Sequence, residues 1–259
     1  MEVIIQPNSQ KLSVIAANVI RKAVIRKPNL VLGLATGSTP IGLYKLLVQM
    51  HKEEGVDFSK VITFNLDEYI GIPKDHPQSY HTFMNKHFFN HVNIPKKNQY
   101  LPQNIVENHV SFCQEYEDSI RRCGGIDIQV LGIGKDGHIG FNEPGSSFAS
   151  RTRIATLSKS TLEANAVHFG DDINAVPEMA ITMGIGTITD AKQCLLLASG
   201  LNKKDAIAKT IEGPISAMVP ATALQMHPDV VFLIDEAAAS SLKEREYYKR
   251  SYENKIKYS

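Results

Sequence analysis

Short apolar runs alternate with longer segments of helical periodicity along most of the chain. Between Ser9 and Lys27 the apolar residues recur at the spacing of one helix face, which predicts an amphipathic helix. The first strand of the core is predicted at Leu30–Leu34. Further strands are predicted at 61–66, 126–133, 179–184, 194–198 and 230–234, and further helices at 40–54, 79–91, 111–123 and 203–211.

Strands that alternate with helices of this length are typical of βαβ units. We therefore expect an α/β, modified Rossmann-like fold with a doubly wound, mostly parallel open sheet and helices on both faces. The 259 residues are 43% hydrophobic, which suffices for one large core, so a single domain over 1–259 is favoured. Charged residues and tyrosines dominate 242–258, which indicates an exposed C-terminal helix.

The charge balance argues against some partners. The chain has 28 lysines and arginines against 27 aspartates and glutamates, a net charge of +1, and no basic stripe that would follow a nucleic-acid backbone. Neither a signal peptide nor a membrane span is recognisable, so we expect a cytoplasmic protein with no membrane or nucleic-acid partner. The 3 cysteines match no metal or disulfide pattern and are expected to be reduced.

The segment Lys135–Pro144 is the richest in chemistry, because it places two carboxylates and an imidazole in a glycine-rich turn directly after a predicted strand. Asp136, His138 and Glu143 can exchange a proton near neutral pH. In open α/β sheets, ligands bind in the loops that follow the carboxyl ends of the strands. We therefore predict proton-transfer catalysis in this segment.

A second polar loop follows the predicted strand at 30–34. It contains Thr36, Gly37, Ser38 and Thr39 at the start of a helix, and their N–H groups and hydroxyls suit a phosphate. An ordinary helix cap by Thr39 explains this loop equally well when it is taken alone.

Asp67 follows the predicted strand at 61–66, and in isolation it is better explained as a solvated carboxylate in a turn. A parallel sheet, however, brings the ends of its strands to one edge, which favours a shared site. Lys203 begins a helix after another strand, so its ammonium can reach the same edge and complement a phosphate. A solvated lysine at a helix start is the alternative.

A divalent metal is the other candidate occupant of Asp136, His138 and Glu143, with or without Asp67. No second histidine stands at ligand spacing, and the usual zinc and iron patterns are absent. Metal binding therefore ranks below proton transfer, and no metal is predicted.

Several motifs together resemble the glucosamine-6-phosphate deaminase family, in its order and spacing and over nearly the whole chain. They are Leu-Ala-Thr-Gly-Ser-Thr-Pro at 34–40, Phe-Asn-Leu-Asp-Glu-Tyr at 64–69, Gly-Lys-Asp-Gly-His-Ile-Gly-Phe-Asn-Glu-Pro at 134–144, Ser-Arg-Thr-Arg at 150–153 and Ala-Leu-Gln-Met-His-Pro at 223–228. This resemblance implies isomerisation and deamination of glucosamine 6-phosphate to fructose 6-phosphate and ammonia, without a metal or organic cofactor.

The resemblance also implies roles for the matching residues. His138 would shuttle the proton that opens the sugar ring, with Asp136 and Glu143 orienting it and tuning its basicity. Asp67 would take the proton from C2 of the sugar and return it at C1. The phosphate would be held by Thr36, Gly37, Ser38, Thr39 and Lys203.

One departure from the family pattern concerns substrate binding. Members usually carry an arginine that reaches the phosphate from a mobile active-site lid, here about 157–182. This chain has Val167 at that position. We expect weak substrate binding unless His168 substitutes.

A second departure concerns regulation. Ser146 and Arg153 match the site at which regulated, hexameric members bind the activator N-acetylglucosamine 6-phosphate. Ala155 stands where those members carry a lysine. We expect reduced or absent activation, and a homo-oligomer like that of the regulated relatives stays an open alternative.

Two other functions compete with this one. A 6-phosphogluconolactonase or a pentose-phosphate isomerase could share the fold and the sugar-phosphate substrate, but neither would release ammonia. A non-catalytic sugar-phosphate sensor would need no imidazole between two carboxylates, although Val167 favours it.

Overall fold

The computed structural model describes residues 1–103 and 108–258, and two β-sheets organise this part of the chain. The larger sheet has seven strands in the order β1-β10-β9-β6-β2-β3-β5, and all neighbours are parallel. They are β1 (Glu2–Gln6), β2 (Val31–Leu34), β3 (Ile62–Asn65), β5 (Gln99–Tyr100), β6 (Ile128–Leu131), β9 (Gln193–Ala198) and β10 (Val230–Asp235).

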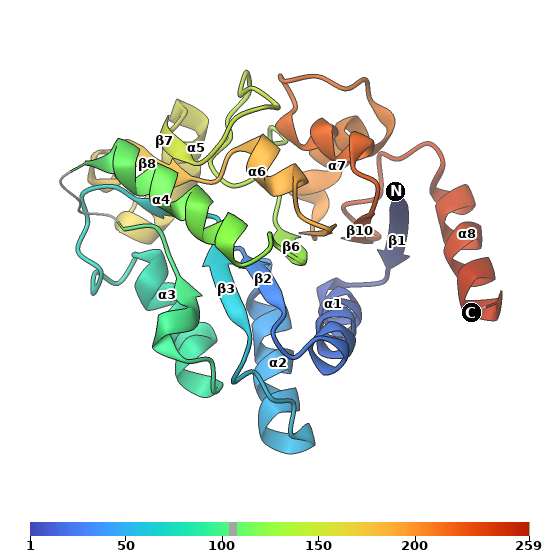
Figure 1. Cartoon of the computed structure of the whole chain (residues 1–259). Helices are drawn as coiled ribbons and strands as arrows, with labels where there is room; N and C mark the ends of the chain where they lie inside the picture. The colour runs from blue at the N-terminus through green and yellow to red at the C-terminus, as the bar shows by residue number, and fades with distance from the viewer. Residues whose placement is uncertain (104–107, 259) are drawn as a thin grey trace.

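Helices cover both faces of this sheet, so the predicted doubly wound α/β fold is confirmed (Figure 1). The α-helices are α1 (Ser9–Arg26), α2 (Ile41–Glu54), α3 (Tyr80–His87), α4 (His109–Arg122), α5 (Lys159–Ala166), α6 (Ile185–Thr189), α7 (Lys204–Glu212) and α8 (Arg245–Tyr258). In Figure 1, α1 and α2 lie on one side of the sheet and α4, α6 and α7 on the other. Strands β9 and β10 are apolar except for Gln193 and Asp235 at their ends, because they lie between two helical layers and neither face meets water.

The direction of strand succession reverses between β2 and β6. From β2 the chain moves outward through β3 to β5, whereas from β6 it moves the opposite way through β9 to β10. Ligands in open α/β sheets bind at the carboxyl ends of the strands where such a reversal occurs. The loops that follow β2 and β6 flank this point, and they carry two of the predicted motifs.

A smaller antiparallel sheet lies beside the carboxyl edge of the large one. Its strands are β4 (Asp67–Tyr69), β8 (Met179–Thr182) and β7 (Arg153–Thr156), in the order β4-β8-β7. Tyr69, Phe141 and Ala180 belong to a separate small hydrophobic cluster at this sheet. Asp67 and Arg153 both pair with Thr182, so the small sheet places these two residues on either side of one strand.

Three sequence predictions are corrected by these strands. The turn expected around Asp67 is strand β4, and β7 was not expected, since neither segment has an apolar alternation. The first strand of the large sheet is β1 and not the strand at 30–34. Its apolar run, Val3–Ile5, is three residues long, and β1 pairs only with β10 at the edge of the sheet.

The start of α2 also differs from the expectation. Pro40, and not Thr39, is the N-cap residue, and no side chain donates or accepts a capping hydrogen bond there. The hydroxyl of Thr39 is therefore not used as a helix cap, which removes the alternative explanation of the loop before α2.

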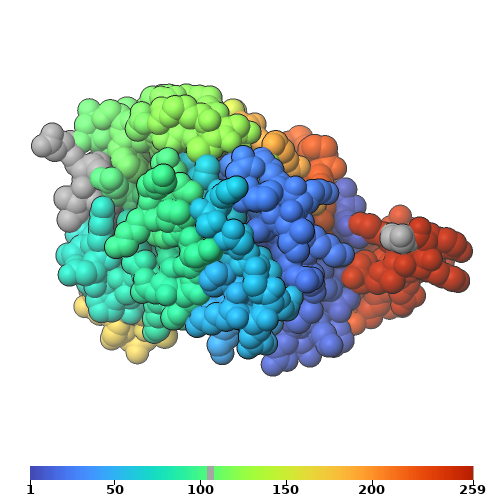
Figure 2. Space-filling model, turned by 60° about the horizontal axis from the view of Figure 1, so that its bottom comes forward, coloured from blue at the N-terminus to red at the C-terminus, as the bar shows by residue number. Residues whose placement is uncertain are grey.

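The C-terminal helix α8 stands at the side of the molecule and forms a separate lobe in Figure 2. None of its residues is buried, although Tyr248 and Tyr252 pack against the main core. Lys255 binds Glu2 with an Nζ to Oε2 distance of 2.7 Å, which ties the helix to β1. Among the residues that the structure describes, no helix is both long and apolar enough to cross a membrane.

Candidate active site

The loop that follows β6 is folded into a tight turn. The N–H of Gly134 donates to the carbonyl oxygen of His138 at 2.9 Å, and the N–H of Gly137 donates to the carbonyl of Gly134 at 3.2 Å. This turn returns the chain over the carboxyl end of β6, so that the imidazole of His138 lies above the edge of the large sheet.

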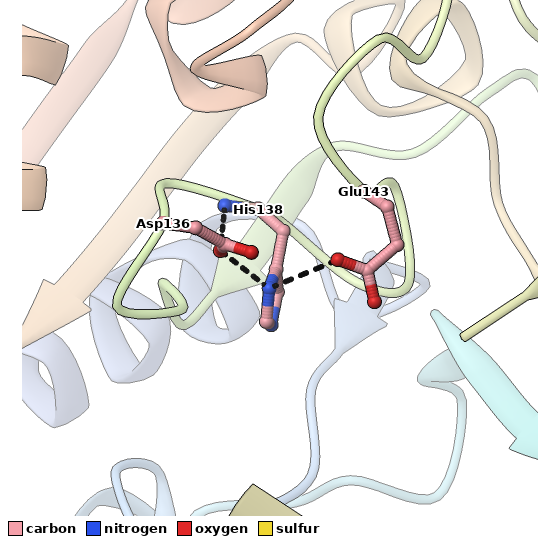
Figure 3. Close-up of side chains that lie close together, drawn as sticks. All are labelled: Asp136, His138 and Glu143. Atoms are coloured by element: carbon pink, nitrogen blue, oxygen red, sulfur yellow. Dashed lines mark hydrogen bonds and ion pairs between the residues drawn. The ribbon is translucent and has the colours of Figure 1, made fainter. Parts of the chain in front are cut away.

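His138 lies between the two carboxylates that accompany it in the motif (Figure 3). Its Nδ1 is 2.7 Å from Oδ1 of Asp136 and 3.7 Å from Oε2 of Glu143. The backbone N–H of His138 also donates to Oδ1 of Asp136, at 3.1 Å. The side chain of His138 is 23% exposed, so the imidazole contacts both carboxylates and is still accessible to a ligand.

The two carboxylates are held differently. Partial burial opposes ionisation of Asp136, but its contacts with His138 outweigh burial and lower the pKa of Asp136 to about 2. Glu143 accepts a hydrogen bond from the N–H of Ser158, the N-cap residue of α5, at 3.1 Å. Asp136 is thus an anion beside the imidazole, and Glu143 links the imidazole to α5.

Gly134 gives the imidazole its space. A Cβ atom placed on Gly134 would lie 2.2 Å from Cε1 of His138, well inside van der Waals contact. A second glycine, Gly140, has a φ of +56° and brings the loop against Asp67. A Cβ on Gly140 would lie 3.3 Å from Oδ2 of Asp67 and 2.9 Å from Oγ1 of Thr182.

Asp67 therefore lies against the same loop that carries His138, although the two are 71 positions apart in the chain. Its side chain is only 6% exposed. Burial, together with the negative charge of Glu68, raises the pKa of Asp67 to about 8. A carboxylate in this state is a much stronger base than one in water.

Glu68 is fully buried and makes four polar contacts, one with Tyr69 in β4 and three at the start of α3. It accepts hydrogen bonds from the N–H groups of Tyr69, Tyr80 and His81, and its Oε2 lies 2.9 Å from Nδ1 of His81. N–H donors at a helix N-terminus stabilise a carboxylate, so they favour a negative charge on Glu68, next to Asp67.

The loop of Thr36, Gly37, Ser38 and Thr39 lies at the carboxyl end of β2, next to the end of β6. Ser38 and Thr39 line a cavity of about 670 Å³ between α1 and α2. Thr36, Asp67, His138 and Lys203 do not line this cavity; Ser38 is exposed, and Thr36 and Thr39 are half-buried.

Lys203 follows β9, which pairs with β6 on the side opposite to β2. It ends the turn after β9, and its Nζ donates to the carbonyl oxygen of Ile133 at 2.7 Å. Burial, with a further contribution from the positive charge of Lys135, lowers the pKa of Lys203, and the negative charge of Asp136 opposes this effect. The structure therefore brings Lys203 to the loop that carries His138.

Ser146 and Arg153 contact each other at the small sheet. Nη2 of Arg153 donates to Oγ of Ser146 at 3.2 Å, and its Nη1 donates to Oδ1 of the buried Asn142 at 2.7 Å. Burial lowers the pKa of Arg153. Ala155 faces the small hydrophobic cluster.

The segment expected to be a lid runs from Leu157 to Thr182. It contains α5, the short helices η3 (Val167–Phe169) and η4 (Ile173–Ala175), and the whole of β8. Val167 is 63% exposed. Phe169 packs edge-on against Tyr69, the residue that ends β4.

The potential ligand atoms of Asp136, His138 and Glu143 lie within 4.8 Å of one another. This set could hold a divalent cation through one imidazole and two carboxylate oxygens. The same geometry serves a proton shuttle without a metal, and the absence of a metal stays a prediction.

Two residues near the site were missed in the sequence. Glu68 stands inside a recognised motif, and its charge next to Asp67 was the available signal. Thr182 accepts a hydrogen bond from the N–H of Phe141 at 3.1 Å and packs against Gly140. Its position depends on β8 lying beside β4, for which local sequence offers no signal.

Comparison with known proteins agrees with this geometry. A family model described as glucosamine-6-phosphate isomerases/6-phosphogluconolactonase matches residues 8–232. Glucosamine-6-phosphate deaminase of Thermoanaerobacter pseudethanolicus is 52% identical over 246 residues, which cover 95% of this chain and 97% of that protein. The deaminase of Clostridium perfringens is 47% identical over 243 residues, covering 94% and 100% of the two chains.

Solved structures give the same result. A monomeric glucosamine-6-phosphate deaminase superposes with a TM-score of 0.91 at 46% identity, over 93% of this chain and all of that one. A 6-phosphogluconolactonase from Leishmania guyanensis reaches a TM-score of 0.72 at 21% identity, over 92% and 97% of the two chains, which shows a shared fold alone. The chain therefore belongs to the family of glucosamine-6-phosphate isomerases and 6-phosphogluconolactonases.

Proposed function

We propose that the chain converts glucosamine 6-phosphate and water to fructose 6-phosphate and ammonia, with Asp67 and His138 as its two proton-transfer groups. The observation that carries the proposal is the approach of the buried Asp67 to Gly140, on the loop that holds His138. One small substrate can therefore touch both groups at once.

The phosphate of the substrate is held by Thr36, Gly37, Ser38, Thr39 and Lys203. Anion binding by a loop at a helix start and by an ammonium group is physically favourable, because both present donors and positive charge. This anchor lies away from the reacting carbons. It fixes them against Asp67 and His138 and so lowers the entropic part of the barrier.

Ring opening comes first. The imidazole of His138 moves a proton between the hydroxyl on C1 and the ring oxygen, which frees the aldehyde. The anionic Asp136 stabilises the protonated imidazole, and Glu143 holds its orientation from the side of α5. A group that titrates near neutrality suits this exchange.

Isomerisation follows on the open chain. Asp67 removes the proton from C2 while a proton of the ammonium group on C2 passes to the oxygen on C1, which leaves an enolamine. Asp67 then returns its proton at C1. The amino group on C2 is then an imine, and addition of water at C2 releases it as ammonia. The raised pKa of Asp67 suits both proton transfers, since the carboxylate must accept the proton from C2 and then donate it to C1.

Asp67→Asn tests the assignment. We expect the rate of ammonia release from glucosamine 6-phosphate to fall about 10²- to 10⁴-fold, the contribution typical of a general base. Binding of inorganic phosphate by calorimetry should persist in the variant. Asp118→Asn, on the exposed face of α4, is the matched control and should keep the wild-type rate.

The same assay separates the competing functions. Hydrolysis of 6-phosphogluconolactone without ammonia release would assign the chain to the lactonases. Phosphate binding without turnover of either substrate would indicate a sensor. A full rate of ammonia release in Asp67→Asn would contradict the mechanism and leave the family unaffected.

Location in the cytoplasm and assembly into a homo-oligomer stay predictions. The proposed reaction needs only the sugar phosphate, water and residues of one chain. The site as described is therefore complete without a partner subunit.

A further inference from the structure

The proposed phosphate site has a shortage of positive charge. Of the residues assigned to it, only Lys203 is a cation, whereas a sugar phosphate carries close to two negative charges near neutral pH. Val167 stands where related enzymes are expected to have an arginine, and it is an exposed apolar side chain. If the proposed function holds, another group of this chain has to balance the remaining negative charge of the phosphate.

The order of the strands points to the loop after β6. β6 lies between β2 and β9 in the large sheet and pairs with both. The phosphate loop follows β2, and Lys203 follows β9. A phosphate held from both sides must therefore lie over the carboxyl end of β6.

Lys135 is the cation at that place. It comes four residues after Leu131, the last residue of β6, and occupies the tight turn closed by the hydrogen bond from Gly137 to Gly134. The ammonium of Lys203 binds the carbonyl oxygen of Ile133, two residues before Lys135. The side chain of Lys135 is exposed.

The two lysines affect each other. After burial, the positive charge of Lys135 is the next cause that lowers the pKa of Lys203. Within the described residues, Lys135 has no hydrogen bond or ion pair with a carboxylate. Two neighbouring ammonium groups repel each other, and an anion that bridges them relieves the repulsion.

We propose that Lys135 is a second phosphate-binding residue, which acts with Lys203 from the turn after β6 and supplies the charge that Val167 cannot. The phosphate then contacts the hydroxyl loop on one side, Lys203 on the other and Lys135 from the turn itself. This arrangement puts the charge on the loop that also carries His138, and not on the segment expected to be a lid.

Lys135→Gln is the test, with two readouts. Loss of one charge-assisted contact should weaken binding of inorganic phosphate in calorimetry about ten- to a hundredfold. In steady-state kinetics KM for glucosamine 6-phosphate should rise by a similar factor with little change in kcat, because the contact lies away from the reacting carbons. Lys60→Gln is the control, since Lys60 is exposed at the opposite edge of the sheet, before β3.

Two further variants sharpen the result. Lys135→Arg keeps the charge and should keep phosphate binding, which excludes a general effect of substitution in the turn. Val167→Arg introduced into Lys135→Gln should recover part of the lost affinity, because it restores a cation from the other side.

The outcomes separate this inference from the proposed function. If the wild-type chain releases ammonia and binds phosphate, but Lys135→Gln binds phosphate as tightly as Lys60→Gln does, the role of Lys135 is wrong and the function stands. If the wild-type chain neither binds phosphate nor releases ammonia, the proposed function itself fails. A drop in kcat with unchanged KM and unchanged phosphate affinity would also overturn the inference.

Discussion

Two aspartates of this site show how far one side chain can be tuned by its surroundings. Asp136 has a pKa of about 2, because its contacts with the imidazole of His138 outweigh partial burial. Asp67 has a pKa of about 8, because it is buried and has Glu68 as a neighbour. The first stays an anion at any physiological pH, and the second can gain or lose a proton near neutral pH, as the proposed proton transfer requires.

Glu68→Gln should shift the pH profile of the reaction. Asp67 acts as a base only when ionised, so kcat rises with pH as it loses its proton, up to a pH of about 8 in the wild-type chain. Removing the negative charge of Glu68 lowers the pKa of Asp67. The rise in kcat should therefore occur at lower pH, measured as initial rates in a constant-ionic-strength buffer series.

If Glu68 has only a structural role, Glu68→Gln should not shift the pH profile of kcat. Glutamine retains one carbonyl oxygen for the N–H donors of α3, so the fold should survive the change. If Glu68→Gln lowers kcat equally at all pH values and leaves the rising limb where it was, the charge of Glu68 does not tune Asp67.

At the scale of elements, the turn after β6 determines where the imidazole lies. Gly134 and Gly132 are two residues apart at the carboxyl end of β6, and they differ in surroundings. A Cβ on Gly134 would overlap the ring of His138, whereas a Cβ on Gly132 would meet no atom within 4 Å.

Gly134→Ala should therefore lower kcat about ten- to a hundredfold, because the ring must move by a large part of an ångström from its position between Asp136 and Glu143. Gly132→Ala is the matched control and should keep the wild-type kcat. Equal rates for the two variants would show that the packing of Gly134 against the imidazole has no bearing on catalysis.

The elements also show what sequence can predict. Buried parallel strands such as β9 and β10 are apolar runs, and they were found within one residue at either end. Because parallel strands share one carboxyl edge, Asp136, His138 and Glu143 after β6 were also expected beside the loop at 36–39 after β2, and β6 does pair with β2. Strand β4 was missed because Asp-Glu-Tyr has no apolar alternation, and its strand geometry comes from pairing with β8, which lies far along the chain.

At the scale of the whole molecule, the small sheet connects the active site to Ser146 and Arg153. Asp67 and Arg153 both pair with Thr182 across β8. Arg153 is already engaged by Asn142 and Ser146. Ala155 belongs to the small hydrophobic cluster and supplies no cation for a phosphorylated effector.

We therefore expect no activation by N-acetylglucosamine 6-phosphate. Initial rates plotted against glucosamine 6-phosphate should follow the same hyperbola with and without this compound. A sigmoidal curve that the compound makes hyperbolic would show that Ser146 and Arg153 form a regulatory site without the lysine.

The hydrogen bond from the N–H of Ser158 to Glu143 joins a neighbour of the imidazole to the start of α5. Ser158 caps α5, so the helix that begins the expected lid also holds one of the two acidic neighbours of the imidazole. A displacement of α5 away from the sheet would break this hydrogen bond and leave Glu143 with one donor fewer. We therefore expect any movement of this helix to change how Glu143 is oriented beside the imidazole of His138.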